Sequence, residues 1–455
     1  MPCPDCRSTD CGAQCRAFPP PSKRSRGALA SAAASGNSAL LEMLEDDFRW
    51  QLEDNPEYAS QCGIHDFDNR LQDLSPSAFE RRKTHAEAQL ARLTQIESTA
   101  SLDERGKLLA SMARDDLSAE AKALSLGCHY FAVNSIGIGG VHHNFVETLQ
   151  WAKHESAEDH AKFVARLEAF PGQVESYKSL LSEGRARGLV ASKAMLRQAV
   201  EQVTANADEP KELRERIAKL GDAVLRARAE TALTAYVGVL RGLASFLDEY
   251  KTHAARDTVG CVGLARDATV GQAIYAHALK YHTTTSMTAD EVHALGLEEV
   301  ARIGKRMEAE VYAPLGLTGP SAAADFAALV EKQRATHFYD SADAVIEGYR
   351  DVCARIEAQL PKFFHPSSRP RATLDIVPKD SPTAPAAYYL AGTPDGARPG
   401  RFLVNVANVR ERPKYEMAAL ALHEASPSAG AFERHLTVIN HSSPPLRPRC
   451  PCALR

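Results

Sequence analysis

The sequence predicts a mainly α-helical protein with a small β element near its C-terminal end. Apolar residues recur at three- and four-residue steps from residue 37 onward, and Ala, Leu and Glu, which are strong helix formers, dominate long tracts. After Phe364 the composition shifts to prolines separated by β-branched residues. With 455 residues, of which 44% are hydrophobic, the chain can bury a large core. We expect one helical body over residues 37–427, a leader over 1–36 and an unstructured tail over 428–455.

The leader is rich in Pro, Ser, Gly and Ala and has too little apolar content to fold. Its cluster of Cys3, Cys6, Cys11 and Cys15 offers four thiolates to zinc, but two more widely separated Cys-x-x-Cys pairs are the usual pattern. No acid occurs between Cys11 and Leu41, which is compatible with an organelle transit peptide. Single cysteines scattered through the body fit reduced thiols, so we expect a cytoplasmic protein, with organelle import as the alternative.

The first helix of the body is expected to carry its apolar residues on one face and to end at Asn55-Pro56. These apolar residues are Leu40, Leu41, Met43, Leu44 and Phe48. Residues 63–68 then read as a loop. Later helices are expected to start at capping boxes, in which a hydroxyl and a carboxylate bond each other's free backbone amides. The matching segments are Ser77–Glu80, Ser101–Glu104, Ser156–Asp159 and Thr288–Glu291.

Two helices are predicted in the second half of the body. The helix after Thr288 has an amphipathic stripe formed by Val292, Leu295, Val300, Ile303 and Met307. The other runs from about Ala342 to Leu360, where Pro361 stops it. The charged run 212–228 is expected to be a solvated helix face.

Two short strands and one further helix are expected at the C-terminal end of the body. Alternation of apolar and polar residues predicts strands over 371–377 and 401–406. A helix is then expected from Pro413, because proline is tolerated at a first helical position, to the pair His423-Glu424.

A His-Glu pair on an apolar helix is typical of zinc hydrolases. The imidazole is a neutral nitrogen ligand, and the carboxylate can act as general base on a metal-bound water. A second histidine four residues later would fall at position 427, which is Pro427. The helix therefore supplies half of a zinc site.

Charge and hydropathy exclude two classes of partner. The formal net charge is −4, and no long basic run is present, so we expect no nucleic-acid binding and no polybasic contact with a membrane. No stretch approaches the roughly 18 continuous apolar residues that a membrane span needs. A soluble protein is expected.

Three groups of segments resemble the domain-of-unknown-function 885 family, a family of predicted α-helical zinc metallopeptidases. They cover residues from about 37 to 427 in the family's order, and the last group is the most specific. The first is 55–59 with Gly63 and 66–73, the second is 275–285 with 288–296, and the third is 386–389, 395–400, 404–405 and 422–427.

The resemblance implies a multi-helix zinc-peptidase fold that cleaves peptide bonds with a metal-activated water. It implies that His423 is a zinc ligand and Glu424 the catalytic base. Positions matching the family's substrate side are Tyr388, Tyr389, Arg398 and Asn405. The family motif continues as Gly-His-His after the proline, whereas residues 428–430 here are Ser-Ala-Gly. The second histidine and the helices that follow it are expected to be missing.

Two functions remain open on this reading. The chain is either a zinc-dependent peptidase with little or no activity, because zinc ligands are missing, or a non-catalytic helical binding or scaffold protein that uses the remaining cleft for a peptide. His435 and His441 are candidate replacement ligands. The oligomeric state is left open. A missing cleft wall would expose apolar helix faces, which favours aggregation or partner binding.

Overall fold

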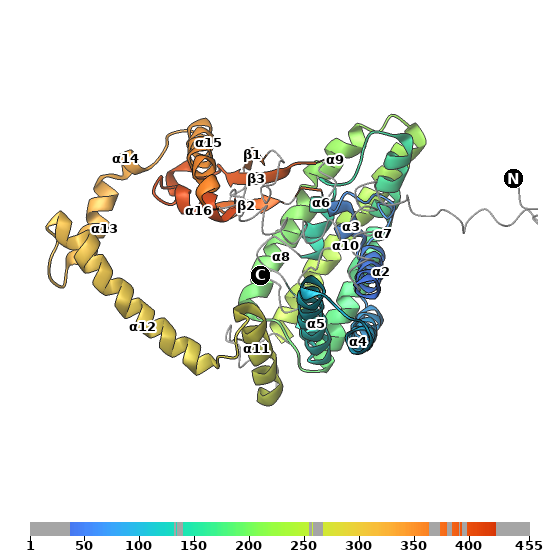
Figure 1. Cartoon of the computed structure of the whole chain (residues 1–455). Helices are drawn as coiled ribbons and strands as arrows, with labels where there is room; N and C mark the ends of the chain where they lie inside the picture. The colour runs from blue at the N-terminus through green and yellow to red at the C-terminus, as the bar shows by residue number, and fades with distance from the viewer. Residues whose placement is uncertain are drawn as a thin grey trace, which may run out of the picture.

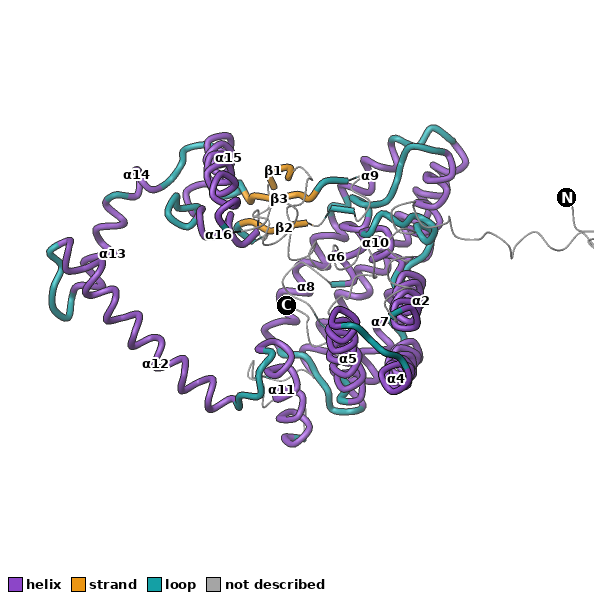
Figure 2. The backbone as a smooth tube through the Cα atoms, viewed as in Figure 1, coloured by secondary structure: helices purple, strands orange, loops and turns teal. Residues whose placement is uncertain are grey.

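The computed structural model describes residues 37–131, 133, 140–253, 257, 267–363, 374–379, 385–390, 392–393 and 398–424. Helices make up most of this part, and its three strands lie together, as Figure 2 shows, which confirms the predicted mainly α fold. The predicted leader and tail lie outside the described residues, as do the leader cysteines. Among the helices of the described part, none has the length and hydropathy needed to cross a bilayer.

The N-terminal half is a helical bundle (Figure 1). Its core is built on α6, α7, α8 and α10, where the rings of Phe145, Phe170 and Tyr236 contact one another at centroid distances of 4.6–5.6 Å. A second apolar cluster joins α2, α4 and α5. The bundle helices are α2 (Ser38–Asp54), α3 (Pro56–Gln61), α4 (Pro76–Thr99), α5 (Glu104–Ser125), α6 (Val141–Thr148), α7 (Ala157–Ala186), α8 (Lys193–Asp208), α9 (Lys211–Ala218) and α10 (Ala223–His253).

Two of the four predicted capping boxes are confirmed, at Ser156 for α7 and at Thr288 for α12 (Ala289–Met307). The predicted box at Ser77 is wrong, because Pro76 is already helical and the hydroxyl of Ser75 accepts from the amide of Ala78. Proline fits the first turn, so the residue before it becomes the cap.

The predicted box at Ser101 is also wrong. Asp103 caps α5 instead, since its carboxylate accepts from the amide of Gly106 at 2.7 Å. The side chain of Asn37 donates to the same carboxylate and holds it in place. This contact comes from a residue 66 positions away, which local spacing could not reveal.

The charged run 212–228 spans two helices, α9 and the start of α10, rather than one. Leu213 and Ile217 are the buried positions of α9, so the run is amphipathic.

An arm of helices leaves the bundle after α11 (Ala268–Thr283) and leads to the sheet, as Figure 1 shows. It contains α12, α13 (Ala322–Lys332) and α14 (Arg334–His337), with a π-helical turn at Glu308–Tyr312 and a short 3-10 turn at Ala313–Leu315. None of the residues of α12 is buried.

A sheet packed on two helices follows the arm. The predicted helix from Ala342 is confirmed as α15 (Ala342–Gln359) and passes into a 3-10 turn that contains Pro361. The strands are β1 (Leu374–Lys379), β2 (Ala387–Leu390) and β3 (Gly400–Asn405), in the order β1-β3-β2, with β1 parallel and β2 antiparallel to β3. The first three residues of the strand predicted over 371–377 lie outside the described residues, and the rest belong to β1. β2 was not predicted as a strand.

The last helix, α16 (Met417–Glu424), is shorter than predicted. Pro413 lies before it, buried, and is followed by a turn. The amide of Lys414 donates to the carbonyl of His337 at 2.7 Å, and its ammonium lies over the ring of Tyr339. These contacts tie the turn before Met417 to the end of the arm.

The two faces of the sheet have different neighbours. Ala387, Phe402 and Val404 pack with α15 and α16, and the ring of Phe402 meets Tyr349 of α15 edge-on at 5.1 Å. Successive residues of a strand face opposite sides. Tyr388 and its cross-strand partner Leu403 therefore lie on the other face, where Glu147 of α6 is close enough to Tyr388 to act on its phenol.

Candidate functional site

The predicted pair His423-Glu424 ends α16 beside strand β2. Oε2 of Glu424 accepts a hydrogen bond from the backbone amide of Tyr389 at 3.0 Å. The side chain of Glu424 is 22% exposed, whereas that of His423 is 80% exposed. Nε2 of His423 lies 3.8 Å from Oε1 of Glu424. The pair thus consists of an anchored carboxylate and a solvent-exposed imidazole.

Helical spacing explains this difference. Met417 and Ala421 are buried against α15 and the sheet, and Glu424 follows Ala421 by three positions. Residues three and four apart share one face of a helix, so Glu424 is directed to the sheet. His423 is rotated by about 100° from it and faces outward.

Tyr389 and Tyr388 lie on opposite faces of β2. The phenol of Tyr389 covers Gly400 across the ladder so closely that a Cβ at this glycine would come within 2.5 Å of its hydroxyl oxygen. Only glycine allows this approach. Tyr389 is therefore fixed by its side chain against β3 and by its amide against Glu424.

Tyr388 faces the bundle, where Glu147 of α6 is its charged neighbour. Burial, and after it the negative charge of Glu147, raise the pKa of the Tyr388 phenol to about 12. The phenol stays protonated at neutral pH and can donate a hydrogen bond. Nε2 of His143 lies 3.3 Å from Oε1 of Glu147, one helical turn away. The sequence did not single out His143 and Glu147, because Glu147 matters only through its position near Tyr388 of β2, a strand far away in the sequence.

Arg398 connects the segment before β3 to the N-terminal bundle. Its Nη2 donates to the carbonyl of Gln61 at 2.5 Å, and its guanidinium lies 6.0 Å from the centre of the Trp151 ring. Its backbone amide donates to Oγ1 of Thr393, and its carbonyl accepts from the amide of the same residue. These contacts are structural. Contact of Arg398 with a substrate stays a prediction.

Asn405 is 1% exposed at the end of β3. Its Oδ1 accepts from the amide of Ala407, and its own amide donates to the carbonyl of Ala386. Its observed contacts therefore stabilise the sheet end, and its role in substrate binding stays a prediction. The structure brings Glu424, His423 and Tyr389 together, with Tyr388 on the opposite face of β2 and Asn405 at the sheet end.

A buried ion pair, which sequence reasoning also missed, orders the loop 62–70. Arg166 of α7 is 1% exposed and donates to the carbonyls of Phe67 and Arg70 and to the hydroxyl of Ser60. Burial opposes the charge of Asp68, but hydrogen bonds from His65 and Ser60 and the charge of Arg166 hold its pKa below the usual value. This loop is next to Gln61, whose carbonyl receives Arg398. The network thus supports the contact between bundle and sheet.

The donor set near α16 does not make a zinc site within the described ranges. A catalytic zinc needs three protein ligands. Among the residues that the structure describes, no three His, Cys, Asp or Glu side chains lie close enough together to hold a metal ion. Oε2 of Glu424 is also engaged by Tyr389. The candidate ligands His435 and His441 lie outside the described residues.

Comparison with known proteins identifies a family and a fold. A family model described as bacterial protein of unknown function (DUF885) matches residues 56–427. The structure resembles that of a putative lipoprotein from Colwellia psychrerythraea, with a TM-score of 0.74, 17% identity and coverage of 90% of this chain and 75% of that one. A putative lipoprotein of unknown function from Shewanella oneidensis gives a TM-score of 0.60 at 16% identity, covering 90% and 73%. No curated protein matches.

Proposed function

The chain belongs to the DUF885 family, whose description states no activity, and we propose from its site that it binds a peptide in extended form along β2, beside Glu424 and His423. The main observation in support of this proposal is the hydrogen bond from the Tyr389 amide to Glu424. It places a carboxylate on the outer side of an edge strand.

The edge strand supports the proposal through backbone chemistry. Among the strands that the structure describes, β2 is the last of the order β1-β3-β2, with its partner β3 on one side. In an antiparallel pair, alternate residues direct their backbone groups toward and away from the partner. The amide of Tyr389 is bonded to Glu424 and so belongs to the outer side. A peptide that adds a strand here would take the Tyr389 amide from the Glu424 carboxylate, which would then lie beside the peptide backbone.

Charge supports the choice of ligand. The carboxylates of Glu424 and Glu147 lie near the two tyrosines of β2, on opposite faces. The guanidinium of Arg398 is held by the carbonyl of Gln61. A peptide that alternates β-branched and cationic side chains would match the extended backbone, and because alternate side chains share one face, its cations would all lie on the side of one of these carboxylates.

Peptide hydrolysis is the second candidate. The observation that favours it is the exposed imidazole of His423 next to the anchored carboxylate of Glu424, as the family resemblance implies for a zinc ligand and its base. The described residues do not fit a catalytic zinc, because no three of their His, Cys, Asp or Glu side chains lie together. We therefore propose binding as the function of this site, with little or no hydrolysis.

The experiment is a titration of the full chain with the pentapeptide Val-Lys-Val-Lys-Val, blocked at both ends and followed by fluorescence anisotropy of an attached dye. We expect saturable binding that an excess of EDTA leaves unchanged. Absence of saturation up to about 1 mM peptide, equivalent to binding weaker than about −4 kcal/mol, would sink the proposal.

A second experiment separates binding from hydrolysis. The same peptide is incubated with the chain and added zinc, and its products are analysed by mass spectrometry. We expect intact peptide with both the natural chain and Glu424→Gln. Cleavage by the natural chain that Glu424→Gln abolishes would show the hydrolytic function, and zinc content per chain would then identify whether residues outside the described part complete the site.

A further inference from the structure

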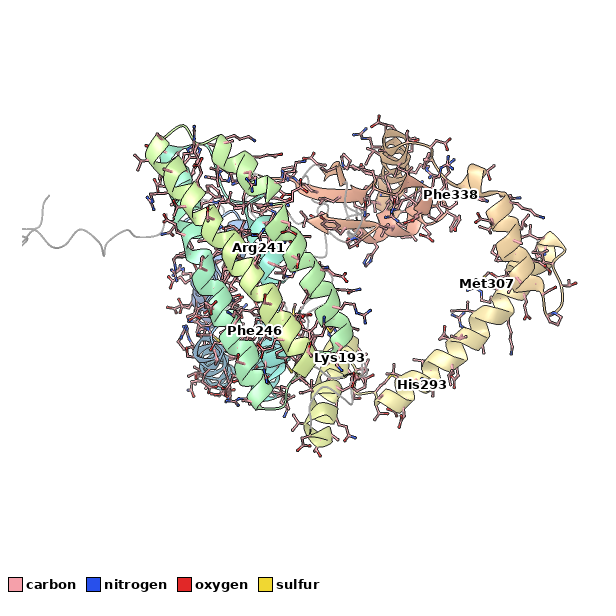
Figure 3. All side chains as sticks on the ribbon, turned by 180° about the vertical axis from the view of Figure 1, so that it is seen from behind. Lys193, Arg241, Phe246, His293, Met307 and Phe338 are labelled. Carbon is pink, nitrogen blue, oxygen red and sulfur yellow. The ribbon has the colours of Figure 1, made fainter. Side chains whose placement is uncertain are left out.

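The helix α12 presents an apolar stripe that nothing covers in the described part of the chain. None of its residues is buried, and Val300 is 70% exposed, Ile303 49% and Leu295 46%. Figure 3 shows α12, with His293 and Met307 labelled, standing apart from the bundle. An amphipathic helix in water normally buries its apolar stripe against a partner.

The stripe has a symmetric spacing. The residues along its centre are Val292, Gly296, Val300, Ile303 and Met307, with Leu295 at its edge, and the line continues to Val311 in the following π-helical turn. The steps are four, four, three, four and four residues, so the pattern reads the same from either end. Its midpoint lies between Val300 and Ile303. Such a stripe matches itself when a second copy runs in the opposite direction, as a two-fold symmetric interface requires.

We propose that α12 is a dimerisation helix that pairs with α12 of a second copy of this chain, antiparallel about a two-fold axis between Val300 and Ile303. In this register Val300 packs on Ile303 of the partner subunit, and Gly296 faces Met307 of the partner subunit. A Cβ at Gly296 would meet nothing within 4 Å in the single chain. The space beside Gly296 accepts the long side chain of Met307 of the partner subunit. Because the pair is symmetric, this contact occurs twice.

The charges of α12 favour the same direction independently. Its first part carries Asp290, Glu291, Glu298 and Glu299 and no Lys or Arg, whereas its last part carries Arg302, Lys305 and Arg306; Glu308 and Glu310 follow in the π-helical turn. Antiparallel pairing places the acidic part of one copy beside the basic part of the other. Parallel pairing would place like charges together, which costs energy.

One cross-pair follows from the helical positions. Glu299 and Arg306 lie on the same flank of the stripe, two helical turns apart, and are placed on either side of the midpoint. In the antiparallel pair Glu299 approaches Arg306 of the partner subunit. Within one chain Glu299 pairs with Arg302 at 2.6 Å and Arg306 with Glu310 at 2.9 Å. These ion pairs are exposed and contribute little, so they do not oppose a rearrangement.

The test is the mass of the full chain in solution by light scattering after size exclusion, at about 1 to 100 μM. We expect twice the chain mass of 49.4 kDa at the upper concentration. Val300→Lys should give the single-chain mass. Ala294→Lys, which places the same charge on the exposed opposite face of α12, should leave the dimer intact. A single-chain mass at all concentrations, or equal effects of the two variants, would overturn the proposal.

Charge exchange tests the direction of pairing. Glu299→Arg should raise the dimer dissociation constant about tenfold, because two attractive contacts become repulsive. Adding Arg306→Glu should restore the original value. Circular dichroism checks that all variants keep their helix content. A double variant that stays as weak as Glu299→Arg would exclude the antiparallel register.

Discussion

Oε2 of Glu424, the last described residue of α16, accepts a hydrogen bond from the backbone amide of Tyr389 on the edge strand β2 at 3.0 Å. The two residues are 35 positions apart in the chain. This contact fixes the carboxylate of the predicted His-Glu pair relative to the sheet, while His423 remains turned to solvent. It is the relationship on which the proposed peptide site depends.

Glu424→Ala should destabilise the sheet and α16 by about 1 kcal/mol, because the Tyr389 amide loses a charged acceptor while the carboxylate is only partly buried. Urea unfolding followed by circular dichroism measures the change. Glu424→Gln retains an oxygen acceptor and should lose less. Glu416→Ala, at an exposed turn position before α16, is the control and should change the free energy of unfolding by no more than a few tenths of a kcal/mol. Equal losses for Glu424→Ala and Glu416→Ala would contradict the anchoring role.

Arg398→Lys should loosen the connection between the sheet and the bundle. Lysine cannot keep both the hydrogen bond to the Gln61 carbonyl and the contact of a planar guanidinium with Trp151. We expect a loss of about 1 to 2 kcal/mol in the free energy of unfolding and faster amide hydrogen exchange in α3. Arg410→Lys, at a largely exposed side chain, is the matched control. Unchanged exchange in α3 would show that Arg398 does not carry the connection.

Asp116→Asn should stabilise the protein at neutral and alkaline pH. Burial, and after it the charge of Asp115, raise the pKa of Asp116 to about 7 from an ordinary 3.8. The folded state therefore holds a proton that the unfolded chain releases, and stability that is full below about pH 4 is lost as the pH rises to about 7. Asparagine is neutral throughout and avoids this loss.

The advantage of Asp116→Asn over the natural chain should grow by about 1 to 2 kcal/mol between pH 4.5 and 8, reduced from the ideal value by partial exposure. Unfolding in urea at several pH values measures it. Asp115→Asn should have a smaller effect, since burial is the larger cause of the shift. Parallel stability curves for the natural chain and Asp116→Asn would contradict the raised pKa.

Local features of the fold could be predicted from the sequence, and features set by distant contacts could not. The capping boxes at Ser156 and Thr288 and the end of α15 before Pro361 depend on neighbouring residues only, and all are confirmed. The start of α16 was predicted too early, because residues 414–416 form a turn that is tied to the end of the arm by the bond from the Lys414 amide to the carbonyl of His337. Strand β2 is four residues long and is defined by its pairing with β3. So short a segment shows too little alternation of apolar and polar residues to be predicted as a strand.

The candidate site shows the same division. His423 and Glu424 could be singled out because they are adjacent on an apolar helix. Their different exposure follows from the spacing of Met417, Ala421 and Glu424, but only the packed sheet reveals that Tyr389 is the partner of Glu424. Glu147 had no recognisable motif, and its position near Tyr388 arises from contact between the bundle and the sheet.

The most direct test of peptide binding along β2 uses three forms of the blocked pentapeptide with the full chain in EDTA. One form is unmodified, and two carry N-methyl groups on alternate sets of backbone amides, which removes those hydrogen-bond donors. Strand addition uses only one of the two sets. We predict that one methylated form binds at least about tenfold more weakly and the other within about threefold of the unmodified peptide. Equal affinities of all three forms would contradict the account.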